Sequence, residues 1–336
     1  MNISIGIVGL PNVGKSTLFN ILTKQAVLAA NYPFATIDPN VGIVPVPDER
    51  IDTLADISES VEKIPAVVEF YDIAGLVKGA STGEGLGNQF LTHIRETSAI
   101  CMVLRVFPSS DVVHVEGEVD ALRDLEILET ELVLKDFETI SSHLDKVTKQ
   151  ARSGDKKEAL RKERVEELYA ALDGGKPLYV SDTLSEEARE IAGELGLLTT
   201  KRQIFLLNGK EEDVSAELRS AIEERRGAYV ISDLGTATDV SGLIGKAYET
   251  LGLMSFFTTG EKETRAWTVR RGALAPEAAG VIHTDFEEKF IRMDVVSYDD
   301  FISCGGWSGA RSKGKARTEG REYEVADGDV VLVKHG

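Results

Sequence analysis

The sequence is poor in cysteine and has no long apolar runs. Two cysteines among 336 residues, Cys101 and Cys304, supply neither a disulfide framework nor a cluster of metal ligands, and we expect both to be small buried side chains. No apolar stretch approaches the ~20 residues of a membrane span, and no secretory leader precedes the first apolar run. We therefore expect a cytoplasmic protein without a membrane partner.

Basic residues are also scarce relative to acidic ones. There are 38 Lys and Arg against 56 Asp and Glu, a formal net charge of −18. Such a field excludes a protein that coats nucleic acid through its overall charge, and no DNA partner is expected. An RNA partner would need a local basic patch. The composition, 42% hydrophobic and 28% charged, is otherwise that of globular proteins, and the length indicates two or three domains.

A glycine-rich segment near the start of the chain carries the strongest signal. Gly9-Leu-Pro-Asn-Val-Gly-Lys-Ser-Thr follows an apolar run, residues 3–8, and precedes an apolar-periodic stretch from Leu18. Gly-x-x-x-x-Gly-Lys-Ser between a strand and a helix is typical of a phosphate-binding loop, whose backbone N–H groups face a polyphosphate. Lys15 would reach the terminal phosphates, and Ser16 would bind Mg²⁺. The predicted nucleotide-binding residues of this loop are Asn12, Val13, Gly14, Lys15, Ser16 and Thr17. A turn that only joins strand to helix is the alternative.

Two later segments complete this interpretation. The proline-broken stretch 31–42 forms a loop in which Thr36 is placed to complete the Mg²⁺ shell. An apolar strand then ends in Asp72-Ile-Ala-Gly75, where Asp72 would support Mg²⁺ and the N–H of Gly75 would face the γ-phosphate. Leu76 stands where Ras-like enzymes have a glutamine that orients water, so hydrolysis must recruit another group or be very slow.

Helical periodicity dominates the middle of the chain. Apolar residues recur at helical spacing from Val119 to Arg152, and a second helix is predicted from Lys156 to about Leu172. We interpret the pair as an inserted antiparallel hairpin. Its tip is basic and is the first candidate for an RNA contact, although a charged helix tip is commonly only a solvated face. The basic tip residues are Lys146, Lys149, Arg152, Lys156, Lys157, Arg161, Lys162 and Arg164.

The α/β pattern resumes with a strand that ends at Asn208-Gly209-Lys210-Glu211. Ras-like GTPases have Asn-Lys-x-Asp here, and the aspartate accepts hydrogen bonds from guanine N1 and its exocyclic amine. Glu211 is longer and cannot take the same bidentate position without a backbone shift. The Asn208 amide and the backbone of Gly209 and Lys210 are predicted to contact adenine. In the alternative, Asn208 only pins the phosphate loop to the base-side loop.

From Phe256 the rhythm changes to short strands and turns, which predicts a separate small α+β domain. Strands are predicted at 265–269, 290–296 and in the segment 323–333, with Asp327-Gly328-Asp329 as a turn. A second basic cluster lies in what reads as a glycine-rich loop. Its members are Arg311, Lys313, Lys315, Arg317 and Arg321. The two basic clusters are hypothesised to face one RNA surface.

Five segments together resemble the YchF family, the Obg-like ATPases. These are residues 9–17, 31–42, 72–81 and 83–88, and Arg265-Ala-Trp-Thr with the stretch 278–286. The resemblance implies a Ras-like P-loop NTPase domain, residues 1–118 and 195–253. It also implies a helical coiled-coil insert, residues 119–194, and a TGS-like domain of β-grasp type, residues 254–336. One departure is the base-side loop, where Ile231-Ser232-Asp233-Leu234 replaces a longer element.

The resemblance also implies a function. Members hydrolyse ATP in preference to GTP and bind ribosomes, so the expected partners are ATP and the ribosome, both rRNA and ribosomal proteins, with the chain a monomer. His114 matches the family's candidate catalytic histidine and is expected to orient the attacking water, and K⁺ beside Asn12 is a further hypothesis. A GTPase, or a nucleotide-gated ribosome-binding module with negligible turnover, remain alternatives.

Overall fold

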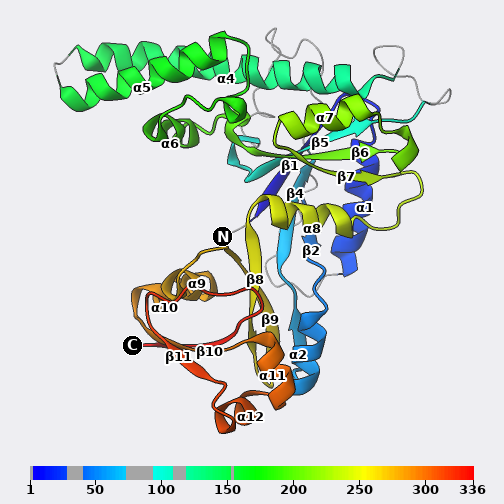
Figure 1. The fold of residues 1–336 in the computed structure, drawn as a ribbon, viewed down its shortest axis with the longest axis vertical. Helices are drawn as coiled ribbons and strands as arrows, with labels where there is room; N and C mark the ends of the chain where they lie inside the picture. The colour runs from blue at the N-terminus through cyan, green and yellow to red at the C-terminus, as the bar shows by residue number, and fades with distance from the viewer. Residues whose placement is uncertain (1–2, 29–40, 73–93, 109–118, 153–154) are drawn as a thin grey trace.

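The computed structural model describes residues 3–28, 41–72, 94–108, 119–152 and 155–336, which form two six-stranded sheets and a long helical hairpin (Figure 1). The first sheet has the order β2-β4-β1-β5-β6-β7, and only β2 and β4 are antiparallel. Its strands are β2 (Val41–Pro45), β4 (Val67–Asp72), β1 (Ser4–Val8), β5 (Ala99–Arg105), β6 (Arg202–Asn208) and β7 (Ala228–Ser232). Every residue of β1 and β5 is buried, as expected for parallel strands covered on both faces.

Several helices pack on this sheet beside its strands. Helix α1 (Lys15–Leu28) contacts β2 and β4, α7 (Ala216–Glu224) contacts β7, and α8 (Ser241–Thr250) contacts β6 and β7. Because β1, β4, β5 and β6 run parallel, their carboxyl ends meet at one edge of the sheet. This edge is where open α/β sheets bind ligands. The α/β class and the strand-loop-helix order predicted around residues 3–22 are confirmed.

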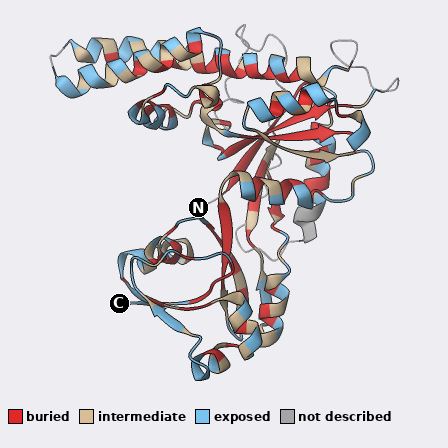
Figure 2. Cartoon of the chain, viewed as in Figure 1, coloured by how far each residue is buried: buried red, intermediate tan, exposed pale blue. Residues whose placement is uncertain are grey.

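The predicted helical hairpin is confirmed and is rooted in the first sheet. Helix α4 (Ala121–Ala151) begins at Asp120, whose carboxylate accepts a hydrogen bond from the Arg123 N–H, and α5 (Lys156–Asp173) begins in the same way at Asp155. The first turns of α4 pack into the core of the first sheet, whereas its later turns pack with α5 in a separate cluster. In Figure 2 the outer turns of the hairpin are mostly exposed or intermediate, with few buried residues. Helix α6 (Glu186–Glu194), which the sequence did not reveal, packs on α5.

The second sheet has the order β11-β10-β12-β8-β9-β3, and all of its strands except β3 come from the C-terminal part of the chain. Its strands are β11 (Arg317–Glu319), β10 (Phe290–Val296), β12 (Val330–His335), β8 (Leu253–Thr259), β9 (Glu263–Arg270) and β3 (Glu62–Ile64), and α9 (Ala275–Ile282) and α10 (Thr284–Glu288) accompany it. Alternate residues of β8 face different cores, because side chains point to opposite faces along a strand. Leu253 and Phe257 belong to the core shared with the first sheet, and Met254 and Phe256 to that of the second.

A segment of the first domain is built into the second sheet. We call residues 46–66 the connecting arm: it leaves the first sheet after β2, forms α2 (Arg50–Ser58) and β3, and returns as β4. Strand β3 pairs in parallel with β9, with Lys63 opposite Thr264. The sequence-based division assigns residues 1–118 to the nucleotide-binding domain, and the structure packs α2 and β3 from that range against β8 and β9.

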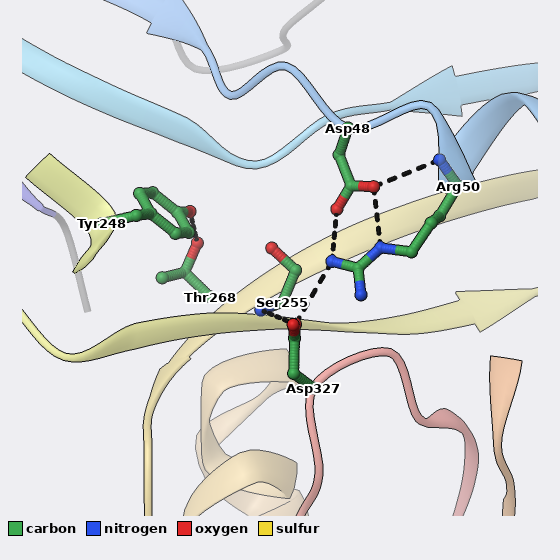
Figure 3. Close-up of polar contacts among 6 residues, drawn as sticks. All are labelled: Asp48, Arg50, Tyr248, Ser255, Thr268 and Asp327. Carbon is green, nitrogen blue, oxygen red and sulfur yellow. Dashed lines mark hydrogen bonds and ion pairs between the residues drawn. The ribbon is translucent and has the colours of Figure 1, made fainter. Parts of the chain in front are cut away.

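An arginine clamp ties the connecting arm to the second domain (Figure 3). The Arg50 guanidinium donates two hydrogen bonds to the Asp48 carboxylate, at 2.8 and 2.7 Å, and one to Asp327 at 3.2 Å. Asp327 also accepts from the backbone N–H of Ser255 on β8. The two carboxylates raise the pKa of Arg50, which keeps the guanidinium charged. The clamp therefore joins the arm, β8 and the turn before β12.

Some expectations for the second half of the chain were wrong. The glycine-rich loop that carries the second basic cluster is helix α12 (Trp307–Ser312) followed by strand β11, because Gly305 at φ 70° and Gly306 at φ 100° end α11 (Tyr298–Cys304) and allow a new helix to start. Cys101 is buried as expected, but Cys304 is only half-buried. Among the residues that the structure describes, no helix is both long and apolar enough to span a bilayer.

Candidate nucleotide site

The loop between β1 and α1 requires glycine at two positions because other backbone and side-chain atoms approach it closely. A Cβ atom on Gly9 would lie 2.7 Å from the carbonyl oxygen of Val103, and one on Gly14 would lie 2.5 Å from Nδ2 of Asn208. Gly14 also has φ of 112°, a conformation that disfavours any side chain. The loop is thus a tight turn that opens directly into the first turn of α1, where the positive end of the helix dipole favours an anion.

Lys15 and Asp72 bring opposite charges to this edge of the sheet. Lys15 is 9% exposed, and its ammonium donates to the carbonyl oxygens of Gly9 and Leu10, at 2.9 and 2.7 Å. Asp72 ends β4, and it lies opposite Ile7 of β1. Burial lowers the pKa of Lys15, and the charge of Asp72 opposes this shift; burial likewise raises the pKa of Asp72 against the charge of Lys15. The mutual effect places the two charges within electrostatic reach.

The described residues fit an Mg²⁺ site that is completed by phosphate oxygens. Ser16 and Thr17 are exposed in the first turn of α1, so their hydroxyls are accessible. A hydroxyl and one carboxylate are the hard oxygen donors that Mg²⁺ prefers when a nucleotide supplies the remaining ligands. No group of three or more His, Cys, Asp or Glu side chains capable of holding a metal occurs in the described part of the chain, and this kind of site does not need one. Thr36, the third predicted ligand, lies outside the described residues.

Asn208 joins the phosphate loop to the base-side loop. It ends β6, is 5% exposed, and donates from Nδ2 to the carbonyl oxygen of Val13 at 2.8 Å. Its Oδ1 accepts from the N–H of Leu234 at 3.0 Å. Both ends of the amide are therefore used within the protein, as expected of a residue that pins the phosphate loop to the base-side loop. Leu234, which sequence reasoning missed, is buried beside Gly14.

The residues after Asn208 are held by neighbouring side chains. The Gly209 N–H donates to the carbonyl oxygen of Ser232, and the Lys210 N–H donates to the Asp213 carboxylate at 2.9 Å. A Cβ atom on Gly209 would lie 2.5 Å from Val106, so glycine is required there. Glu211 begins a short 3₁₀ turn, η4 (Glu211–Asp213), and its carboxylate accepts from Arg219 of α7 at 2.7 Å.

Sequence reasoning also missed Arg105, a buried cation at the carboxyl end of β5. It is 1% exposed, lies opposite Asn208 in the sheet register, and its Nε donates to the carbonyl oxygen of Phe107. Its guanidinium carbon lies 4.7 Å from the centre of the Phe107 ring. The available signal was a charged residue at the end of an otherwise apolar strand, residues 99–106. Gly75 and His114, both predicted site residues, lie outside the described residues.

The sheet order, the tight glycine loop at the start of α1 and the acidic end of the neighbouring strand define a P-loop nucleotide-binding protein of the Ras-like α/β class. A family model described as a 50S ribosome-binding GTPase matches residues 4–137, and a YchF-GTPase C-terminal model, described as a protein of unknown function, matches residues 253–336.

Curated relatives match nearly the whole chain. The "Ribosome-binding ATPase YchF" of Bacillus subtilis is 43% identical over 98% of both chains. "Obg-like ATPase 1" of Rattus norvegicus is 40% identical over 99% of this chain and 92% of its own. A solved structure of the Schizosaccharomyces pombe YchF GTPase superposes with a TM-score of 0.84 at 37% identity, over 99% of this chain and 98% of that one. The chain therefore belongs to the YchF family, as its motifs indicated.

Proposed function

We propose that this protein is an Mg²⁺-dependent nucleoside triphosphatase that binds ATP in preference to GTP, hydrolyses it slowly and acts on the ribosome as a monomeric translation or stress factor. The observation that carries the proposal is the phosphate loop, with Gly9 and Gly14 in close backbone contacts and Lys15 at the start of α1. Relatives named as ribosome-binding ATPases support the same function.

The loop supplies binding through its backbone and one cation. On binding a triphosphate, the Lys15 ammonium exchanges its bonds to the Gly9 and Leu10 carbonyl oxygens for phosphate oxygens, and the N–H groups at the start of α1 face the same charge. Ser16 and Asp72, with Thr36, are the proposed Mg²⁺ ligands. A Mg²⁺ ion held by these residues would neutralise charge on the phosphates during transfer.

The base-side residues support a preference for adenine. Guanine presents two donors, N1 and N2, which a Ras-like aspartate accepts, and the residue here is Glu211, whose carboxylate is bound to Arg219. A site discriminates by leaving the polar groups of the wrong base unpaired. We expect ATP to bind about tenfold more tightly than GTP, which corresponds to ~1.4 kcal/mol. Asn208 contributes by holding the loops together, and the carbonyl groups of the 208–211 stretch are the proposed acceptors for adenine N6.

For hydrolysis, we assign the orientation of water to His114, since Leu76 has no polar atom with which to do so. A neutral imidazole can accept a hydrogen bond from water near pH 7. A K⁺ ion held beside Asn12, which has φ of 63°, would add a positive charge next to the phosphates. Equal rates of hydrolysis in Na⁺ and K⁺ buffers would argue against the ion.

The hairpin tip is the proposed ribosome contact. Lys156 and Lys157 are exposed and form no ion pair with any described residue, whereas Arg161, Lys162 and Arg164 pair with nearby glutamates. Basic side chains of the second cluster form ion pairs within the protein, for example Lys315 with Asp300 at 3.1 Å. The tip and α12 lie at opposite ends of the molecule, so an RNA surface that touched both would have to span its length (Figure 1).

Competition titration tests the nucleotide part of the proposal. Unlabelled ATP should displace a fluorescent ATP analogue at about one tenth of the concentration that GTP requires, and removal of Mg²⁺ with EDTA should stop phosphate release. Equal displacement by the two nucleotides would contradict the ATP preference and favour a GTPase. Normal binding without phosphate release, with and without ribosomes, would favour the nucleotide-gated binding module.

A further inference from the structure

The Glu211 carboxylate, which takes the place in the sequence of the Ras-like aspartate that reads guanine, is held by a side chain of α7. Arg219 of α7 donates from Nη2 to Oε1 of Glu211 at 2.7 Å. The Glu211 side chain is 72% exposed, so nothing but this arginine confines it among the described residues. The carboxylate is the strongest hydrogen-bond acceptor in the Asn208–Glu211 stretch, and its direction therefore depends on Arg219.

Arg219 is itself oriented by the edge strand of the first sheet. Its Nη1 donates to the hydroxyl of Tyr229 on β7 at 2.8 Å, and its guanidinium carbon lies 5.6 Å from the centre of the Tyr229 ring. Helix α7 starts next to this site at Ser215, whose hydroxyl accepts from the N–H of Leu218. Tyr229, Arg219 and Glu211 thus form a chain of contacts from β7 through α7 to the base-side turn.

We infer that Arg219 is a specificity-determining positioning residue, which keeps the Glu211 carboxylate turned away from the base and so lowers the affinity for guanine nucleotides. Two effects act together. The carboxylate is directed along the surface toward α7, and its charge is balanced by the guanidinium, so the donors at guanine N1 and N2 lose the acceptor that they would otherwise find. Adenine has an acceptor at N1 and gains nothing from a carboxylate there. This inference rests on the proposed ATP preference and names its structural source.

The size of the effect follows from the exposure of the pair. An exposed ion pair is weak because water screens its charges, so releasing Glu211 should raise GTP affinity by no more than about fivefold. ATP affinity should stay within about twofold. A purely structural role for Arg219 would instead change both affinities together or neither.

The test measures ATP and GTP affinities of the full chain by competition titration. Arg219→Met keeps the length of the side chain and removes its charge, and it should raise GTP affinity about fivefold. The gain must disappear in the double variant with Glu211→Gln, because it depends on the freed carboxylate. Arg219→Lys should keep most of the wild-type selectivity.

A matched control removes an arginine that is not near the base. Arg226→Met removes the same charge from another exposed ion pair, that of Arg226 with Asp182 at 2.8 Å, and should leave both affinities unchanged. If Arg219→Met does not fold, Tyr229→Phe removes only the hydroxyl that Arg219 donates to, and should raise GTP affinity by about twofold.

The measured affinities test the ATP preference and the role of Arg219 separately. Equal affinities of the wild-type protein for ATP and GTP would refute the proposed preference, whatever the variants do. A wild-type preference for ATP that survives unchanged in Arg219→Met, or a GTP gain that persists in the double variant, would overturn the role of Arg219.

Discussion

Replacing Asn208 by alanine separates a structural pin from a base contact. In the structure the amide bonds the carbonyl oxygen of Val13 and the N–H of Leu234, at 2.8 and 3.0 Å, and is 5% exposed. Asn208→Ala leaves both groups buried without a partner, at a cost of about 1–3 kcal/mol each, so the free energy of unfolding should fall by about 4 kcal/mol. With a urea m-value of ~2 kcal/mol/M, the midpoint should fall by about 2 M.

The measurement must report on the domain that carries the change. Both tryptophans, Trp267 and Trp307, lie in the second domain, so their fluorescence follows that domain, and far-UV circular dichroism follows the whole chain. The destabilisation should be seen by dichroism. Thr236→Ala, in the same base-side loop but with an exposed hydroxyl, should cost no more than about 0.5 kcal/mol and serves as the control.

Nucleotide affinity then decides the role of the amide. A pin acts on both nucleotides, because it positions the phosphate loop, so Asn208→Ala should weaken ATP and GTP by the same factor. A loss confined to ATP would refute this reasoning and assign the amide to adenine, and an unchanged urea midpoint would refute the pin itself.

Three further outcomes are expected. His114→Ala should abolish phosphate release with ATP affinity kept, and unchanged turnover would remove His114 from the mechanism. Lys157→Glu should weaken ribosome co-sedimentation and reduce its salt sensitivity. The same change at Lys176, which is exposed just beyond the other end of α5, should have no such effect. Equal effects of the two changes would show that the tip is not the contact. Arg50→Met should lower the stability of the second domain by about 1–2 kcal/mol after solvent screening, which tryptophan fluorescence would report as a lower urea midpoint. An unchanged midpoint would mean that the clamp contributes nothing to stability.

The sequence pattern was sufficient to predict the structure of segments whose conformation depends on their own residues. The phosphate loop follows from the spacing of Gly9 and Gly14 between an apolar strand and a helix, because close contacts leave no room for a side chain at either position. The hairpin helices follow from apolar periodicity, and the structure ends them within two residues of the expected bounds. Strand β10 has the bounds that the sequence predicted, residues 290–296.

Tertiary structure decided everything that depends on distant partners. The Asn208 amide bonds Val13 across 195 positions. Arg219 is close to Glu211 in the sequence, but the sequence of α7 does not predict that one arginine joins Glu211 to Tyr229 of β7. The connecting arm joins the second sheet because β3 pairs with β9, some 200 residues later in the sequence. The local propensity of a segment does not select the strand with which it pairs. Thr36, Gly75 and His114 lie outside the described residues, and their roles remain predictions of the sequence. The sequence by itself thus determined the phosphate loop and the two hairpin helices, whereas the tertiary structure decided which side chains from distant segments hold the phosphate loop and where the connecting arm pairs.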